Sequence, residues 1–176
     1  MNGVPRSQST KKLLIVAFDK TDGAEILERP LVSRFALQML LLRSVMPEVR
    51  MRSGQASADD ILSEVCRLRV AQKADFAIGI TDRDLVVPDM NFVFGLASAD
   101  GACAVVSTNR LKGNGQAPYH ERLLKEAVHE LGHVLGLTHC DDPRCVMHFS
   151  NSLRDTDTKR DTFCTRCSSK LSHSLQ

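Results

Sequence analysis

The spacing of apolar side chains in the first part of the chain predicts a strand followed by a helix. Residues 13–18 form a continuous apolar run, LLIVAF, which is typical of a buried strand. From Pro30 apolar residues recur at helical spacing, with this proline opening the helix and Pro47 closing it. The positions that this pattern turns inward are Leu31, Phe35, Met39, Leu42 and Met46. Residues 49–54 are expected to form a short second strand.

The middle of the chain predicts another helix and two cysteines in the core. Ser57 and Asp60 have the spacing of a capping box, so a helix should begin after Ser57. Its apolar positions are Ile61, Leu62, Val65 and Leu68. Cys66 falls on this helix and Cys103 lies in a later apolar run, and each is expected to be a small buried residue.

The following segments predict a strand, a hairpin and a long helix. Residues 74–81 have the pattern of an interior strand. The apolar runs 92–97 and 102–107 flank Asp100 and Gly101, a pair that favours a hairpin turn, so these strands should pair antiparallel. An amphipathic helix is expected to begin near Pro118. Its inward residues are Leu124, Val128, Leu131 and Leu135. These elements together predict a mixed α/β sandwich.

Length and charge limit the classes of protein that this chain can represent. Its 176 residues suit one domain, and 23 basic against 21 acidic residues provide no electrostatic argument for nucleic-acid binding. No segment reaches the ~18 apolar residues of a membrane span, and residues 13–18 are too few for the core of a signal peptide. We therefore expect a cytoplasmic monomer with a flexible tail at residues 1–11 and a single domain at residues 12–176.

The segment HELGHVLGLTHC contains the pattern HExxHxxGxxH, whose parts are His129, Glu130, His133, Gly136 and His139. Residues four apart on a helix share a face, so His129 and His133 can bind one metal ion. Glu130 is offset by one position, which lets its carboxylate act as general base toward a metal-bound water. The pattern predicts a catalytic zinc site.

Gly136 explains how His139 reaches the same ion. A helix that continued would carry His139 too far along its axis, whereas glycine adopts the left-handed conformation that ends a helix and reverses the chain. Three neutral imidazoles and an open position are typical of a catalytic rather than a structural zinc ion.

Four cysteines follow in two close pairs, Cys140 with Cys145 and Cys164 with Cys167. This spacing favours four thiolates around a second, structural zinc ion, and two disulfides are the alternative. A reducing compartment disfavours persistent disulfides. Because His139 and Cys140 are neighbours, the two metal sites should be mechanically coupled.

Met147 closely follows the second cysteine, and on its own a methionine is usually core filler. HExxHxxGxxH followed by CxxxxCxM and a later CxxC resembles the archaemetzincin family of zinc metallopeptidases. The motifs span residues 129–167, and sixteen residues separate Met147 from Cys164 where the family pattern usually has seventeen. The resemblance implies that Met147 packs beneath the metal and does not bind it.

The resemblance also implies a metzincin-like fold, with a twisted mixed sheet over an active-site helix. It implies an upper subdomain at residues 12–136 and a small zinc-bound lower subdomain at residues 137–176. An edge strand of the sheet would bind extended peptide substrate, and the candidate residues are Phe92, Val93, Phe94 and Gly95. An edge strand without this role fits the pattern equally well.

The expected activity is peptide-bond hydrolysis, and for some family members the resemblance implies aminopeptidase activity. Tyr119 and His148 are candidates for stabilising the oxyanion, and Asp89 and Asp100 are candidates for binding a substrate ammonium group. Two alternatives stay open at this point. One is a zinc-stabilised binding protein with little or no proteolytic activity, and the other is a zinc hydrolase of non-peptide bonds.

Overall fold

The central feature of the computed structural model, which describes residues 10–19, 21, 23–113 and 116–174, is a five-stranded sheet. Its strand order is β2-β1-β5-β8-β7. β1 (Lys12–Phe18) pairs in parallel with β2 (Gln38–Ser44) and β5 (Phe76–Thr81), and β5 pairs in parallel with β8 (Cys103–Ser107). β7 (Gly95–Ser98) is antiparallel to β8 and forms one edge of the sheet. Residues 1–9 of the expected flexible tail lie outside the described residues.

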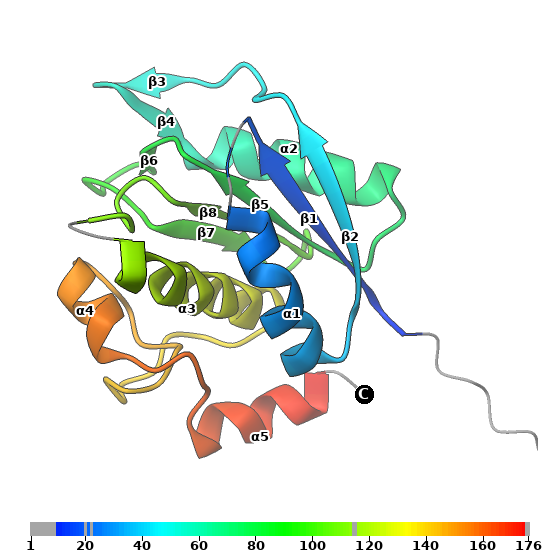
Figure 1. Ribbon diagram of the computed structural model, residues 1–176, viewed down its shortest axis with the longest axis vertical. Helices are drawn as coiled ribbons and strands as arrows, with labels where there is room; N and C mark the ends of the chain where they lie inside the picture. Colours follow the sequence, from blue (N-terminus) through cyan, green and yellow to red (C-terminus); the bar gives the residue numbers. More distant parts are fainter. Residues whose placement is uncertain (1–9, 20, 22, 114–115, 175–176) are drawn as a thin grey trace, which may run out of the picture.

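Helices cover both faces of this sheet (Figure 1). α2 (Ala58–Ala71) packs on one face, where it meets the alternate residues Leu14, Val16 and Phe18 of β1. α1 (Gly23–Phe35) and α3 (Gln116–Val134) pack on the other face. Because both faces of β1 are covered, its residues 13–18 are all apolar and buried. The predicted mixed α/β fold is confirmed.

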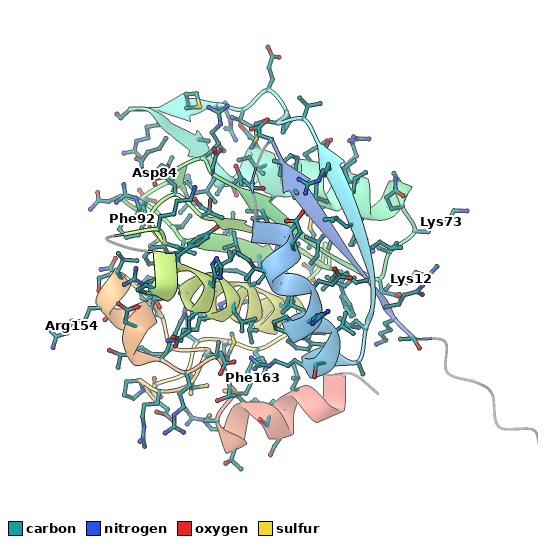
Figure 2. The ribbon with its side chains drawn as sticks, in the orientation of Figure 1. Lys12, Lys73, Asp84, Phe92, Arg154 and Phe163 are labelled. Carbon is teal, nitrogen blue, oxygen red and sulfur yellow. A yellow bond between two sulfur atoms is a disulfide. The ribbon has the colours of Figure 1, made fainter. Side chains whose placement is uncertain are left out.

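Smaller elements complete the molecule. β3 (Met51–Arg52), β4 (Gln55–Ser57) and β6 (Leu85–Val86) form a second sheet. α4 (Leu153–Thr158) and α5 (Thr165–Ser174) lie on the side of α3 that faces away from the sheet (Figure 1). Figure 2 labels Phe163, whose ring packs edge-on against Phe35 of α1 with centroids 6.3 Å apart. Within the described residues, no helix combines the length and apolarity that crossing a membrane requires.

The predicted helix from Pro30 to Pro47 is wrong. Pro30 lies inside α1, which begins at Gly23 and ends at Phe35, and Ala36 follows with a left-handed φ of 51°. Residues 38–44 then form β2, which pairs with β1 along its whole length. Met39 and Leu42 are three apart, a spacing that also fits a helix, but pairing of this run with the central strand decided the outcome.

The other predicted elements occur with shifted boundaries. Ser57 caps α2 by accepting a hydrogen bond from the amide of Asp60, but the carboxylate of Asp60 binds Arg50 and does not complete a capping box. The predicted hairpin of residues 92–107 is antiparallel, although its first strand begins only at Gly95. In α3 the predicted Val128 and Leu131 are buried, but Leu124 is only half-buried and its neighbour Leu123 is fully buried instead.

The structure joins Cys66 of α2 to Cys103 of β8 in a disulfide. The sequence predicted two separate core residues, and disulfides appeared disfavoured. α2 packs directly on β8 and brings the two Cα atoms to 5.4 Å, a separation that a disulfide can span. Two cysteines distant in sequence provide no local signal of this pairing.

Candidate metal centre

Three histidine side chains converge at the end of α3. The nitrogen donors of His129, His133 and His139 all lie within 4.8 Å of one another. His129 Nδ1 lies 2.7 Å from the carbonyl oxygen of Val146, and His133 Nδ1 lies 2.7 Å from that of Leu137. A carbonyl oxygen only accepts, so each Nδ1 carries the proton and each Nε2 presents a lone pair.

The spacing of these lone pairs fits a metal ion. The Nε2 atoms of His129 and His133 lie 3.1 Å apart. Tetrahedral zinc with Zn–N bonds of about 2.0–2.1 Å requires nitrogen neighbours about 3.3 Å apart. Burial lowers the pKa of all three imidazoles, that of His129 most strongly, which keeps them in the neutral form that binds metal. The donor set therefore suits zinc.

Gly136 ends α3 as the sequence predicts. Its φ is +86°, the left-handed conformation that glycine adopts without strain. The amide of Leu137 donates to the carbonyl of Gly132, and the amide of Gly136 donates to that of His133, each at 2.9 Å. This pair of bonds is a Schellman motif, which reverses the chain and returns His139 to the first two histidines.

Glu130 is buried beside the histidine cluster, with 5% of its surface exposed. Burial raises the pKa of its carboxyl group to about 8, the charge of Glu126 adds to the shift, and Lys159 opposes it. A divalent cation at the histidines favours the ionised form and so also opposes the shift. A Cβ atom on Gly95 would lie 2.6 Å from Glu130 Oε1, so the backbone of β7 rests directly against this carboxylate.

A cleft of about 470 Å³ opens above the histidines. One wall comes from residues that precede or belong to β7, and Figure 2 labels Phe92 in this region. The opposite side comes from α3 and from the segment that follows Met147. The lining residues include Val87, Met90, Phe92, Leu96, Glu126 and Ser150, together with the three histidines and Glu130.

Four thiols converge at a second point. The sulfur atoms of Cys140, Cys145, Cys164 and Cys167 all lie within 4.8 Å of one another. Cys140 Sγ lies 3.8 Å from Cys164 Sγ, and tetrahedral zinc with Zn–S bonds of about 2.3 Å requires about 3.8 Å. These cysteines are not disulfide-bonded. The arrangement fits four-thiolate zinc coordination better than the two-disulfide alternative.

Arg166 donates to Cys140 Sγ at 3.3 Å. Burial by itself raises the pKa of the Cys140 thiol, but hydrogen bonds from Arg166 and the Asp142 amide outweigh it and lower the pKa to about 7. A lower pKa favours the thiolate, which is the form that binds zinc.

One turn, formed by Cys145, Val146, Met147 and His148, connects the two clusters. Cys145 belongs to the thiol cluster, and the Val146 carbonyl accepts from His129. The Met147 carbonyl accepts from the Cys140 amide at 2.9 Å. A Cβ atom on Gly132 would lie 2.3 Å from Met147 Sδ, so this methionine packs against α3 at the residue next to His133.

The other candidates from the sequence do not line the cleft, namely Tyr119, His148, Asp89 and Asp100. Of these, His148 belongs to the turn between the clusters, and its Nδ1 lies 2.9 Å from the carbonyl oxygen of Cys140. The second carboxylate of the cleft lining belongs to Glu126, which the sequence analysis did not consider. Helical spacing could have identified Glu126, because it lies one turn before Glu130. Lys159, which pairs with Glu126, has no comparable signal in the sequence.

Comparison with known proteins agrees with this geometry. The family model described as Peptidase family M54 matches residues 32–173. The archaemetzincin of Archaeoglobus fulgidus is 42% identical over 147 residues, which cover 84% of this chain and 89% of that protein. The archaemetzincin of Aeropyrum pernix is 52% identical over 94 residues, or 53% of this chain and 51% of that protein.

Solved structures share the fold. The crystal structure of archaemetzincin from Methanopyrus kandleri superimposes with a TM-score of 0.86 at 38% identity, and 98% of each chain is covered. A zinc-dependent peptidase from Methanocorpusculum labreanum has a TM-score of 0.77 at 25% identity, covering 90% of this chain and 99% of that one.

Proposed function

Because the chain belongs to peptidase family M54, the archaemetzincins, and is therefore a zinc-dependent metallopeptidase, we propose that it hydrolyses peptide bonds at the histidine cluster. His129, His133 and His139 would hold the catalytic ion. A zinc ion held by these residues would supply a coordinated water with a pKa of about 7 and polarisation of a substrate carbonyl group. Glu130 accepts the proton of the attacking water and delivers it to the leaving amine.

The observation that carries this proposal is the convergence of His129 Nε2 and His133 Nε2 beside the buried carboxylate of Glu130. Their Nδ1 atoms are held by backbone carbonyls of Val146 and Leu137, so the rings need little reorganisation to bind metal. The cleft gives a peptide access to Glu130 and the histidines from one side. A positioned base beside an open metal site is the arrangement that hydrolysis requires.

The substrate would lie along β7 as an additional strand. β7 is the last strand of its sheet, and Leu96 and Ala97 line the cleft. Backbone hydrogen bonds from an exposed edge orient an extended peptide without reading its sequence. Of the predicted residues Phe92, Val93, Phe94 and Gly95, only Gly95 belongs to this strand, so the proposed binding edge shifts to Gly95–Ser98.

Cys140, Cys145, Cys164 and Cys167 would hold a second, structural zinc ion. Four thiolates leave no open position for substrate. The proposed division into an upper subdomain at residues 12–136 and a lower one at residues 137–176 places this ion in the lower subdomain, whose Val146 carbonyl accepts a hydrogen bond from His129 of the upper one. Release of residues from a free amino terminus is the proposed mode of cleavage.

The test is a pair of measurements on zinc-loaded protein. Elemental analysis should find two zinc ions per chain, and a broad peptide library should be cleaved. Glu130→Gln should keep both ions and hydrolyse nothing. Glu121→Gln is the matched control, because Glu121 is an exposed residue of the same helix. Turnover retained in Glu130→Gln would contradict the assignment of the base.

A further inference from the structure

Glu126 is a buried carboxylate that the proposed hydrolysis does not use. Only 2% of its surface is exposed, and that surface lines the cleft. It precedes Glu130 by four residues, which places it on the same side of α3, about 6 Å along the helix axis. A carboxylate is costly to bury, so its position at the floor of a substrate cleft requires a reason.

Lys159 and Thr156 bind one oxygen of the Glu126 carboxylate, and Lys159 does so from outside the cleft lining. Lys159 Nζ lies 3.0 Å from Glu126 Oε1, and the Thr156 hydroxyl donates to the same oxygen at 3.0 Å. The Lys159 side chain is completely buried and does not line the cleft, whereas Glu126 does. The ion pair is therefore a dipole whose negative end faces the substrate. Because both described bonds go to Oε1, Oε2 can accept from a group in the cleft.

Ser150 adds an independent observation on the same cleft. Its hydroxyl oxygen is buried and has no hydrogen-bond partner among the residues that the structure describes. A buried unpaired hydroxyl indicates a missing partner such as a ligand or an ordered water. Ser150 lines the cleft together with Glu126, while Val87, Met90, Phe92 and Leu96 make the wall apolar. Glu126 and Ser150 thus add two polar groups to a cleft that also has an apolar wall.

Resting on the proposed peptidase function, we propose that Glu126 and Ser150 form a subsite that binds an ammonium group of the substrate, with Lys159 and Thr156 fixing the position of the Glu126 carboxylate. An ammonium group carries three donors, which suit a carboxylate oxygen and a hydroxyl oxygen together. Burial of both groups strengthens such bonds. An apolar group at the same place would leave both oxygens without a partner.

Two kinds of ammonium group in a peptide substrate could reach Glu126 while the scissile carbonyl lies beside Glu130. The α-amino nitrogen of a peptide lies about 2.5 Å from the carbonyl carbon of its own residue. The side-chain amine of lysine reaches further on a flexible stem. The first source would make the enzyme an aminopeptidase, and the second would make it selective for lysine beside the scissile bond. Both depend on the same carboxylate, so paired ligands can distinguish them.

The experiment measures dissociation constants of small hydroxamates on zinc-loaded protein by calorimetry. Leucine hydroxamate against N-acetyl-leucine hydroxamate tests the α-ammonium group. N-acetyl-lysine hydroxamate against N-acetyl-norleucine hydroxamate tests the side-chain ammonium group. We expect at least a tenfold preference for the ammonium-bearing member of one pair. Equal affinities within both pairs would overturn the proposal.

Variants identify the residues responsible. Glu126→Gln should abolish the preference by weakening only the ammonium-bearing ligand, Ser150→Ala should reduce it two- to threefold, and Glu121→Gln on the exposed face of α3 should leave it unchanged. Because Glu126→Gln leaves Lys159 buried without its partner, the double variant Glu126→Leu with Lys159→Met replaces the pair by apolar groups, which proteins often tolerate. A preference that survives in either variant would contradict the proposal.

Peptide turnover separates this inference from the function on which it rests. Selective hydroxamate binding by a wild-type protein that cleaves no peptide would count against the peptidase proposal and leave the subsite standing. Cleavage of peptides with no preference for a free amino terminus or a lysine, together with equal hydroxamate affinities, would remove the subsite alone.

Discussion

The histidine cluster and the cysteine cluster are adjacent in the chain and different in design. His139 is exposed and the histidines border a cleft, whereas Cys140, Cys145 and Cys167 are buried. Their spacings match different ligands, 3.1 Å between imidazole nitrogens and 3.8 Å between thiol sulfurs. Three donors beside a cleft leave room for water and substrate, and four donors that complete a tetrahedron do not. Ligand number and exposure, rather than position in the chain, separate the two proposed roles.

The difference extends to the surroundings of each cluster. Carboxylates and a buried lysine lie next to the histidines, where Glu126, Glu130 and Lys159 interact. The cysteines are instead approached by Arg166, a cation that suits thiolates. The groups around the histidine cluster can transfer protons, whereas Arg166 beside the cysteine cluster only balances the negative charge of the thiolates. The following predictions test how far the two clusters are independent.

The largest expected effect is the loss of one site without the other. His133→Ala should remove one zinc ion and all peptidase activity, because two remaining imidazoles cannot complete the catalytic set. The cysteine site should keep its zinc. Elemental analysis and peptide turnover are the measurements, and His120→Ala, an exposed histidine of the same helix, is the control. Loss of both ions would show that the clusters form a single unit.

Cys164→Ser should have the opposite pattern. We expect loss of the structural zinc and a destabilisation of about 4 kcal/mol, which lowers the Tm by about 10 °C. Because the turn at 145–148 also orients His129, affinity for the catalytic zinc should fall about tenfold. Thermal unfolding and zinc titration measure both effects, with Ser169→Ala of α5 as the control. Unchanged stability and unchanged affinity of the histidine site would refute the coupling.

Burial of Glu130 predicts a pH-dependent cost of stability in metal-free protein. Its pKa is raised to about 8 from an ordinary value of 4.5, so the folded chain holds a proton that the unfolded chain releases, and stability falls as pH rises between these values. Metal-free Glu130→Gln should therefore be more stable than the wild type at pH 8 by a few kcal/mol. Denaturant unfolding should show the difference vanishing near pH 4.

Equal stabilities of the wild type and Glu130→Gln at pH 8 would contradict this prediction. They would mean that solvent or a positive charge stabilises the ionised Glu130 carboxylate in the folded protein. Glu28→Gln provides the comparison, since Glu28 is an exposed residue of α1 and its substitution should be neutral at both pH values.

The smallest expected effect concerns the strand above the site. In Gly95→Ala the new Cβ would lie 2.6 Å from Glu130 Oε1, so either the carboxylate or β7 must move. Displacing a catalytic base by about 1 Å can cost about 100-fold in rate. We expect kcat to fall by this order while both zinc ions stay bound. Kinetics on one peptide, together with zinc analysis, would measure the fall in kcat. An unchanged kcat would show that β7 can move to accommodate the new Cβ without displacing the Glu130 carboxylate.

The local elements were predictable to different degrees. The cap at Ser57 and the chain reversal at Gly136 follow from properties of single residues, and the structure has both. The segment 38–44 was assigned to a helix because apolar spacing is ambiguous in a short run, and only pairing with β1 makes it a strand. The hairpin was predicted, but the position of its first strand depends on its contacts with β8.

The sequence alone determined the metallopeptidase family and the identity of the candidate ligands, since helical periodicity and a glycine bring residues close in sequence to one point. Only the tertiary structure decided which groups from distant segments surround them. It places Gly95 against Glu130, pairs Lys159 with Glu126, and joins Cys66 to Cys103. These contacts depend on how the sheet, α3 and the C-terminal segment pack together, and packing between distant segments leaves no periodic trace in the sequence.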